Sequence, residues 1–192
     1  MSDFGFYFSL GWEHIISWDA LDHQLFILAL AAIYLLKNWK QVLVLVTAFT
    51  IGHSLTLALT VLNIIHFPSA WIEFLIPCTI VATAISNLFQ KNFTPRSIRI
   101  NYFLALFFGL IHGMGFANTI RFMLAKDQYI AVPLISFNFG LEAGQIVVVT
   151  FILLSSYILV NKSGLNRKWW VWALSAFAFL IALYMAANRW PR

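Results

Sequence analysis

The sequence contains little charge and almost no cysteine. Only 10% of its 192 residues are charged, whereas a soluble domain has about 25%. In contrast, 61% of the residues are hydrophobic and the mean hydropathy is +0.84. A soluble core of this size does not need so much apolar surface, so the composition predicts an integral membrane protein. The single cysteine, Cys78, excludes an internal disulfide.

Other absences narrow the class further. The N-terminus, MSDFGFYFSLGWEH, has no basic start and no small-residue cleavage site, so we expect no cleavable signal peptide. The net charge of +5 is modest, and the basic residues are scattered between apolar runs, which argues against a nucleic-acid partner. Apart from Arg99 at the very start of one run, no lysine or arginine falls inside an apolar run, which disfavours an anion path.

Six apolar runs are long enough to cross a bilayer, which takes roughly 17–25 residues. They cover residues 20–36, 41–65, 70–90, 98–116, 132–160 and 169–187. We therefore expect an all-α fold, a polytopic membrane helix bundle with about six transmembrane helices, and a single integral-membrane domain over residues 1–192. The aromatic segment 1–19 and the amphipathic segment 117–130 are expected to lie in the membrane interface.

The basic residues predict the orientation of the chain. Eight of the twelve fall in or at the edge of the gaps after the first, third and fifth runs, at Lys37, Lys40, Lys91, Arg96, Arg99, Lys162, Arg167 and Lys168. Cytoplasmic loops carry an excess of Lys and Arg. Both termini are therefore expected on the outer side, in a multi-pass protein of the cell membrane.

Ionisable side chains inside the runs are costly and usually face the bundle interior or a cavity. Asp19, Asp22 and His23 in WDALDHQLF are spaced i, i+3 and i+4, which places them on one helix face. An aspartate at a helix N-terminus is explained by capping, and Asp19 fits that interpretation. Capping does not explain the adjacent His23, so we interpret the Asp22–His23 pair as part of a site.

Two further histidines fall deep in apolar runs. His53 lies in TIGHSLTLALT, and His112 lies in GLIHGMGFA. Gly109 and Gly113 form a G-x-x-x-G pattern that permits close helix packing around His112. The alternative for each histidine is an inert core side chain that is hydrogen-bonded to a neighbour.

Glu142, within FNFGLEAGQ, is a carboxylate well inside a run rather than near its end. Asn138 and Gln145 share its helix face, and Gly140 and Gly144 form a second G-x-x-x-G pattern. A buried carboxylate must be paired, protonated or bound to a cation. Pairing with one of the histidines is the structural alternative to a role in a site.

Depth connects these residues. At 1.5 Å per residue, His53 and His112 come out roughly 9–12 Å below the outer face of a ~30 Å core. His23 is about one turn deep and Glu142 is at most ~15 Å deep. Four residues from four runs therefore share one layer. We interpret Asp22, His23, His53, His112 and Glu142 as the metal site, with His14 and Asp19 as further candidates and Asn138 and Gln145 as supporting groups.

Imidazole and carboxylate together suit a divalent nickel, cobalt or zinc ion, and outer acidic residues would gather such cations. Three functions use this chemistry. The first is a permease that binds and moves the metal. The second is an intramembrane zinc hydrolase acting on a lipid or similar substrate. The third is an accessory membrane subunit with a structural polar layer. The oligomeric state, including a homo-oligomer, is left open.

Four motifs carry a family resemblance, namely WDALDHQLF, GHSLTLAL, GLIHGMGFA and FNFGLEAGQ. In this order, over about residues 14–150, they resemble the HupE/UreJ family of hydrogenase- and urease-associated membrane proteins, regarded as nickel permeases. The resemblance implies about six helices, a bacterial cytoplasmic membrane and divalent-metal uptake.

The resemblance also implies roles for single residues. Asp22 and His23 match an Asp-His pair implicated in the metal path of such permeases, and His14 is the only histidine upstream of it. Seven residues separate His14 from Asp22, which is longer than the His-x-x-x-x-Asp-His spacing of related nickel and cobalt permeases. His53, His112 and Glu142 match the later motifs.

Overall fold

The computed structural model describes residues 3–90, 98–123 and 130–191. Its elements are α1 (Asp3–Ile16), η1 (Trp18–Ala20), α2 (Leu21–Ala31), η2 (Leu36–Asn38), α3 (Trp39–Val61), α4 (Ser69–Leu88), α5 (Ile98–Met123), α6 (Ala131–Ser156), η3 (Tyr157–Lys162) and α7 (Arg167–Asn188). Every element in this part of the chain is helical, which confirms the predicted all-α class.

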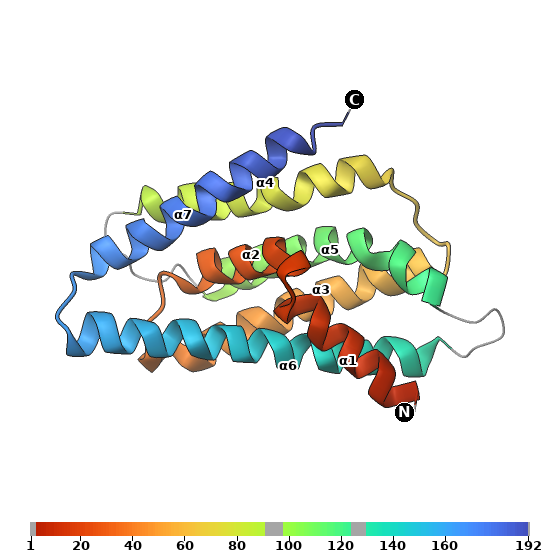
Figure 1. Ribbon diagram of the computed structural model, residues 1–192, viewed down its shortest axis with the longest axis horizontal. Helices are drawn as coiled ribbons and strands as arrows, with labels where there is room; N and C mark the ends of the chain where they lie inside the picture. The colour runs from red at the N-terminus through yellow and green to blue at the C-terminus, as the bar shows by residue number, and fades with distance from the viewer. Residues whose placement is uncertain (1–2, 91–97, 124–129, 192) are drawn as a thin grey trace.

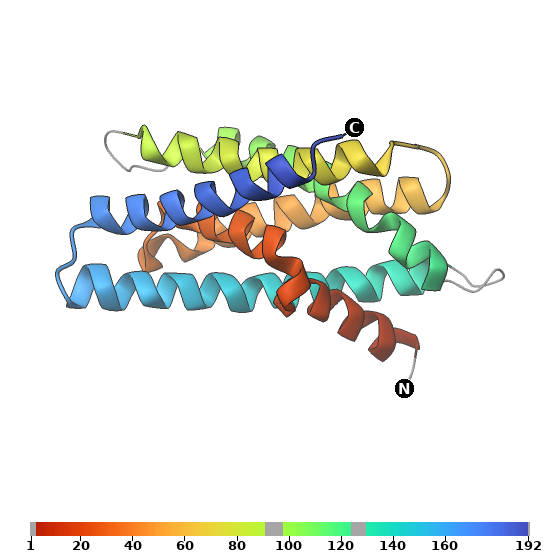
Figure 2. The ribbon, with the colours of Figure 1, turned by 45° about the horizontal axis from the view of Figure 1, so that its top comes forward.

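The helices form an elongated bundle, and the chain runs back and forth along its length (Figures 1 and 2). One pass is made by α1 and α2 together, and α3 to α7 each follow as a pass in the reverse direction of the one before. Both termini therefore lie toward the same end of the bundle. The most extensive contacts join α3 to α5, α1 to α6 and α4 to α7.

Within the described residues, four helices are long and apolar enough to cross a membrane. They cover Leu36–Val61, Ser69–Leu88, Ala131–Lys162 and Arg167–Asn188. These match the expected second, third, fifth and sixth runs. The expected fourth run lies in α5, whose apolar part, Asn101–Phe116, is shorter.

The expected first run does not form one long helix. The helix α2 has only 11 residues and ends at Ala31, and α1 before it has 14. The prediction of a continuous helix over 20–36 is therefore wrong. The chain completes this pass with two short helices that meet at a break, residues 17–20, near the middle of the bundle (Figure 2).

The two segments expected in the interface have different outcomes. Residues 117–123 continue α5, and residues 124–129 of the second segment lie outside the described residues. The first segment forms α1, which packs closely on α6. A Cβ built on Gly11 would lie 2.0 Å from the Phe137 carbonyl oxygen, and one on Gly140 would lie 2.0 Å from the Phe8 carbonyl oxygen.

Glycines also bring α5 against α3. A Cβ on Gly109 would lie 2.2 Å from the Phe49 carbonyl oxygen, and one on Gly113 would lie 2.1 Å from the His53 carbonyl oxygen. Gly52 makes the reciprocal approach from α3, toward the Leu106 carbonyl. The G-x-x-x-G pattern around His112 is thus used for close packing, as predicted.

Candidate metal site

The break between α1 and α2 brings His14 to His23. They are nine positions apart in the sequence, so in one continuous helix they would lie about 13.5 Å apart along the axis and on opposite faces. The turn at Trp18–Ala20 redirects the chain, and the two ring centroids come to 4.6 Å. The long spacing between His14 and the Asp22–His23 pair is therefore accommodated by a change of helix.

Gln24 satisfies the backbone at this break. Its Nε2 donates to the carbonyl oxygens of Ile15, Ile16 and Ser17 at 3.0, 3.2 and 2.9 Å. Helix ends leave carbonyls without partners inside the helix, and such groups must be satisfied within a membrane protein. The Gln24 side chain, on α2, thus caps the C-terminal end of α1. Gln24 was not among the residues singled out from the sequence.

Three histidines from three helices form the centre of the site. The possible ligand atoms of His14 (α1), His23 (α2) and His53 (α3) all lie within 4.8 Å of one another. A tetrahedral ion with nitrogen ligands at about 2.1 Å separates those nitrogens by about 3.4 Å. Small side-chain rotations would therefore bring this group, the histidine cluster, to bonding distance of one ion.

The histidine cluster and the neighbouring His112 have ring nitrogens that form no hydrogen bond in the described structure. The Nε2 atoms of His14 and His23, both ring nitrogens of His53, and Nδ1 of His112 are buried without a hydrogen-bond partner there. His53 is 0% exposed. A buried polar atom without a partner costs free energy, so a ligand that bonds to these nitrogens would remove that cost.

Asp22 orients His23. Its Oδ1 accepts from the His23 backbone N–H at 2.8 Å and lies 2.9 Å from the His23 ring Nδ1. Since a carboxylate accepts, this contact places the ring proton on Nδ1 and leaves the lone pair of Nε2 for a ligand. Arg189, which follows α7, lies 3.4 Å from the other oxygen of Asp22.

His112 lies beside the cluster, with its ring centroid 4.9 Å from that of His23. Its Nε2 lies 3.3 Å from Oγ1 of Thr79 on α4. Because the Thr79 hydroxyl donates to the Ile76 carbonyl at 2.7 Å, it accepts from His112. The proton of His112 is thus on Nε2, and the Nδ1 lone pair is the one available to an ion.

A cavity of about 430 Å³ leads to the histidines. Its polar lining residues are Glu13, His14, Ser17, Asp19, Asp22, His23, Glu73, His112 and Arg189. Four carboxylates face one guanidinium, so this space, the acidic vestibule, attracts cations. The acidic vestibule also includes Glu13 on α1 and Glu73 on α4. Asp19 lies exposed in η1 rather than on the face of α2.

Glu142 has a different neighbour from the one expected. Its carboxylate accepts from Thr47 Oγ1 of α3 at 2.7 Å, and Thr47 is exposed on the outside of that helix. Next to it, Gln145 accepts from Thr50 Oγ1 at 2.8 Å. The expected convergence of Glu142 with the histidines is not seen, since the described His, Cys, Asp and Glu side chains group without it. Asn138, on the same helix, has a buried Oδ1 without a partner in the described structure.

Replacing Gln24 with leucine tests the role of the break. We expect Ni²⁺ affinity to fall about 10-fold or more, because the bonds from Gln24 to the end of α1 are lost and α1 no longer holds His14 against His23. Titration calorimetry on the purified protein measures this. Gln41→Leu, at the start of α3, is the matched control and should bind as the wild type does. Equal affinity in both variants would contradict a positioning role for Gln24.

Comparison with known proteins gives one match. A family model described as HupE / UreJ protein matches residues 1–189. The chain matches no curated protein and no solved structure. The match covers nearly the whole chain, including α1 and α7, which extends beyond the stretch that carried the motifs.

Proposed function

Since the chain belongs to the HupE/UreJ family, we propose that it is a membrane permease that binds and moves a divalent transition metal, nickel or cobalt before zinc. One observation carries this proposal. Buried imidazole nitrogens of His14, His23 and His53 come together from three helices, at the end of a vestibule with excess negative charge. Neutral imidazole is the commonest protein ligand for such ions.

The proposed topology has six passes, with α1 and α2 forming one discontinuous pass. Discontinuous helices often bind the substrate ion of a transporter at their break. The connections from α2 to α3 and from α6 to α7 lie at the end opposite the termini, and Lys37 in η2, Lys162 in η3 and Arg167 at the start of α7 lie there. Under the positive-inside rule that end is cytoplasmic. The termini and the acidic vestibule then face outward, and the metal enters from there.

The ligand set we propose is His14, His23 and His53, with the Nδ1 of His112 as a fourth donor. Asp22 holds His23 in the binding tautomer through their 2.9 Å contact. Glu142 is assigned to the contact between α3 and α6 rather than to the ion. Direct hydrogen bonds between histidines and Glu142 were the expectation for a purely structural polar layer, and the Thr47 partner of Glu142 does not support that alternative.

Flux through purified protein tests the proposal. Proteoliposomes loaded with a metal-quenched dye would be mixed with Ni²⁺ or Co²⁺, with and without an imposed proton gradient. We expect quenching by either ion that requires the protein and is not reduced by excess Mg²⁺. Vesicles with the His53→Ala variant should behave like protein-free vesicles. Zinc that co-purifies stoichiometrically, without flux of any ion, would contradict the permease and favour the hydrolase.

A further inference from the structure

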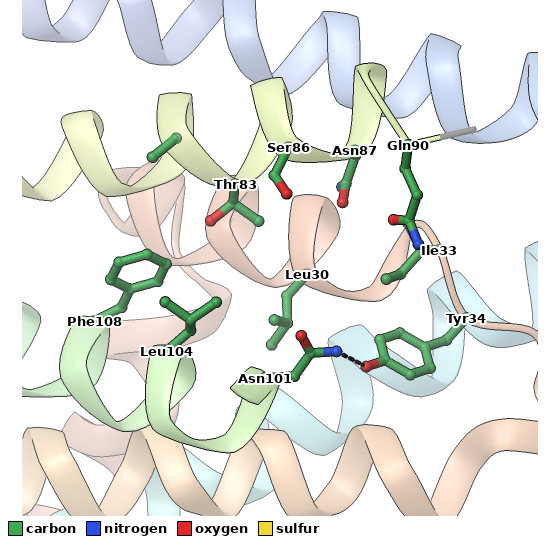
Figure 3. Close-up of a pocket in the computed structure, with 11 residues that line it drawn as sticks. Leu30, Ile33, Tyr34, Thr83, Ser86, Asn87, Gln90, Asn101, Leu104 and Phe108 are labelled. Atoms are coloured by element: carbon green, nitrogen blue, oxygen red, sulfur yellow. Dashed lines mark hydrogen bonds between the residues drawn. The ribbon is translucent and has the colours of Figure 1, made fainter. Parts of the chain in front are cut away.

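A second cavity lies on the other side of His112 from the acidic vestibule. It has a volume of about 190 Å³ and lies between α2, α4 and α5 (Figure 3). Its polar lining residues are Tyr34, Thr83, Ser86, Asn87, Gln90 and Asn101. We propose that this space, the inner chamber, is a water-filled stop for a hydrated divalent cation between the histidine cluster and the inner face. The inference rests on the proposed permease function.

The lining of the inner chamber offers oxygen atoms that can accept hydrogen bonds from the waters around a hydrated cation. The Asn87 Nδ2 donates to the Ala29 carbonyl at 2.7 Å and contacts Ser175 Oγ at 3.3 Å, and the Asn101 Nδ2 donates to the Tyr34 hydroxyl at 2.7 Å. With both amide nitrogens engaged, the amide oxygens are turned toward the chamber (Figure 3). Oxygens from amides and hydroxyls accept from the waters of a hydrated cation.

The lining also predicts weak binding. All its polar groups are neutral hydroxyls or amides, in contrast to the acidic vestibule. Conduction requires sites that an ion enters favourably and leaves easily. A chamber of neutral oxygens after a cluster of imidazoles meets that requirement, because the ion exchanges strong nitrogen ligands for water.

One helical turn on each of two helices connects the histidines to the chamber. Thr79 of α4 accepts from His112, and its carbonyl accepts from Thr83 Oγ1 at 2.9 Å, which lines the chamber. On α5, Phe108 lies one turn before His112 and also lines it. Phe26 contacts both, with centroids 5.6 Å from Phe108 and 5.5 Å from His112. These two phenyl rings therefore pack between the inner chamber and His112, where a passing ion would have to displace them.

The inner chamber also opens sideways between α4 and α5, so a lipid acyl chain is the alternative to water as its occupant. Ala82 and Leu104 line the chamber and are exposed on the bundle surface between α4 and α5. An acyl chain of the bilayer would enter there if the chamber were a lipid groove. Two cavity-facing amide oxygens would then lie against hydrocarbon without partners, which is costly. The polar lining therefore favours water.

Thiol labelling decides between water and lipid. In a Cys78→Ser background, Ser86→Cys places a thiol in the chamber. We expect a charged, membrane-impermeant thiosulfonate to modify it in inside-out vesicles and not in right-side-out ones. Thr150→Cys, at a lipid-exposed position on α6, should stay unmodified in both. Modification of Ser86→Cys by apolar maleimides alone would overturn the proposal.

Filling the chamber tests its place in the path. Thr83→Leu should reduce Ni²⁺ flux about 10-fold or more while the Co²⁺ absorption spectrum of the histidine cluster stays unchanged. Thr150→Leu is the matched control, because both hydroxyls bond a carbonyl one turn earlier, and it should retain flux. Wild-type flux in Thr83→Leu would overturn the chamber but leave the permease intact. Absence of flux in the wild type would instead reject the permease, and the chamber with it.

Discussion

The variant His14→Ala is expected to lose Ni²⁺ and Co²⁺ binding, with affinity falling at least about 100-fold. The reason is geometric. His14 contributes one of three donors whose ligand atoms lie within 4.8 Å of each other, and removal of even a supporting group around a metal ligand costs about 10- to 100-fold. Calorimetric titration and the Co²⁺ absorption spectrum of the purified protein measure the loss. His23→Ala and His53→Ala should behave in the same way.

The fifth histidine supplies the control. His66 lies exposed in the connection between α3 and α4, where its Nε2 is 3.3 Å from Oδ1 of Asn63. His66→Ala should bind metal as the wild type does. Equal affinities of the His14→Ala and His66→Ala proteins would reject His14 as a ligand.

Stability separates a ligand from a structural histidine. Removing a hydrogen-bonded core histidine leaves its partner unsatisfied and costs about 1–3 kcal/mol. His14 Nε2 has no partner among the described residues, so truncation at His14 leaves no partner of this atom unsatisfied, and the metal-free His14→Ala protein should lose only the packing of the ring against Phe116 and Phe137. Added metal at 100 times its Kd stabilises the wild type by about 2.7 kcal/mol. This shift should be absent in the variant, and thermal unfolding in detergent measures both effects.

Much of the bundle could be predicted because length and hydropathy determine a spanning helix. The four long helices fall within a few residues of the expected runs, and Gly109 and Gly113 pack as their spacing indicated. The break between α1 and α2 could not be predicted in this way. Residues 17–20 contain neither proline nor glycine, and the apolar run after Asp19 continues past the end of α2. The break depends on a tertiary contact, the bonds from Gln24 to the end of α1.

The expected depth in the membrane predicted which histidines lie near one another, but it did not predict the neighbour of Glu142. His23, His53 and His112 were expected in one layer, and their rings do lie close together. Glu142 was assigned to the same layer, but a helix position also has a direction around the helix axis. The face of α6 that carries Glu142 meets Thr47 of α3. His14, which belongs to the segment assigned to the interface, is instead brought against His23 by the break.

The second large effect is expected from a single methyl group on α5. In Gly113→Ala, the added Cβ would lie 2.1 Å from the His53 carbonyl oxygen and 2.4 Å from Thr56 Oγ1. The carbonyl belongs to the backbone of α3 and cannot rotate away, so α5 must move outward. Overpacking of this kind costs about 1–3 kcal/mol or more. We expect thermal unfolding in detergent to occur earlier than in the wild type, by about 2–4 °C for each kcal/mol of net destabilisation in a chain of this size.

Gly115→Ala is the matched control, two residues along the same helix. Its Cβ would meet Ile76 Cδ1 at 3.0 Å, which is the end of a flexible side chain. Alanine is favoured over glycine in a helix interior by about 1 kcal/mol, and both substitutions gain this term. At Gly115 the steric cost of the added Cβ is small compared with the gain in helix propensity. Gly115→Ala should therefore unfold at the wild-type temperature or above. At Gly113 the clash with the backbone outweighs it.

The two alanines should also differ in metal binding. His112 precedes Gly113, and its ring lies 4.9 Å from that of His23, so an outward shift of α5 carries His112 away from the histidine cluster. Gly113→Ala should therefore weaken Ni²⁺ binding, whereas Gly115→Ala should leave it unchanged. If Gly113→Ala binds Ni²⁺ and unfolds as Gly115→Ala does, the close packing of α5 on α3 is not what holds His112 in place. Weakened binding with unchanged unfolding would instead mean that α5 shifts at little cost, and that the position of His112 depends on this packing more than the stability of the bundle does.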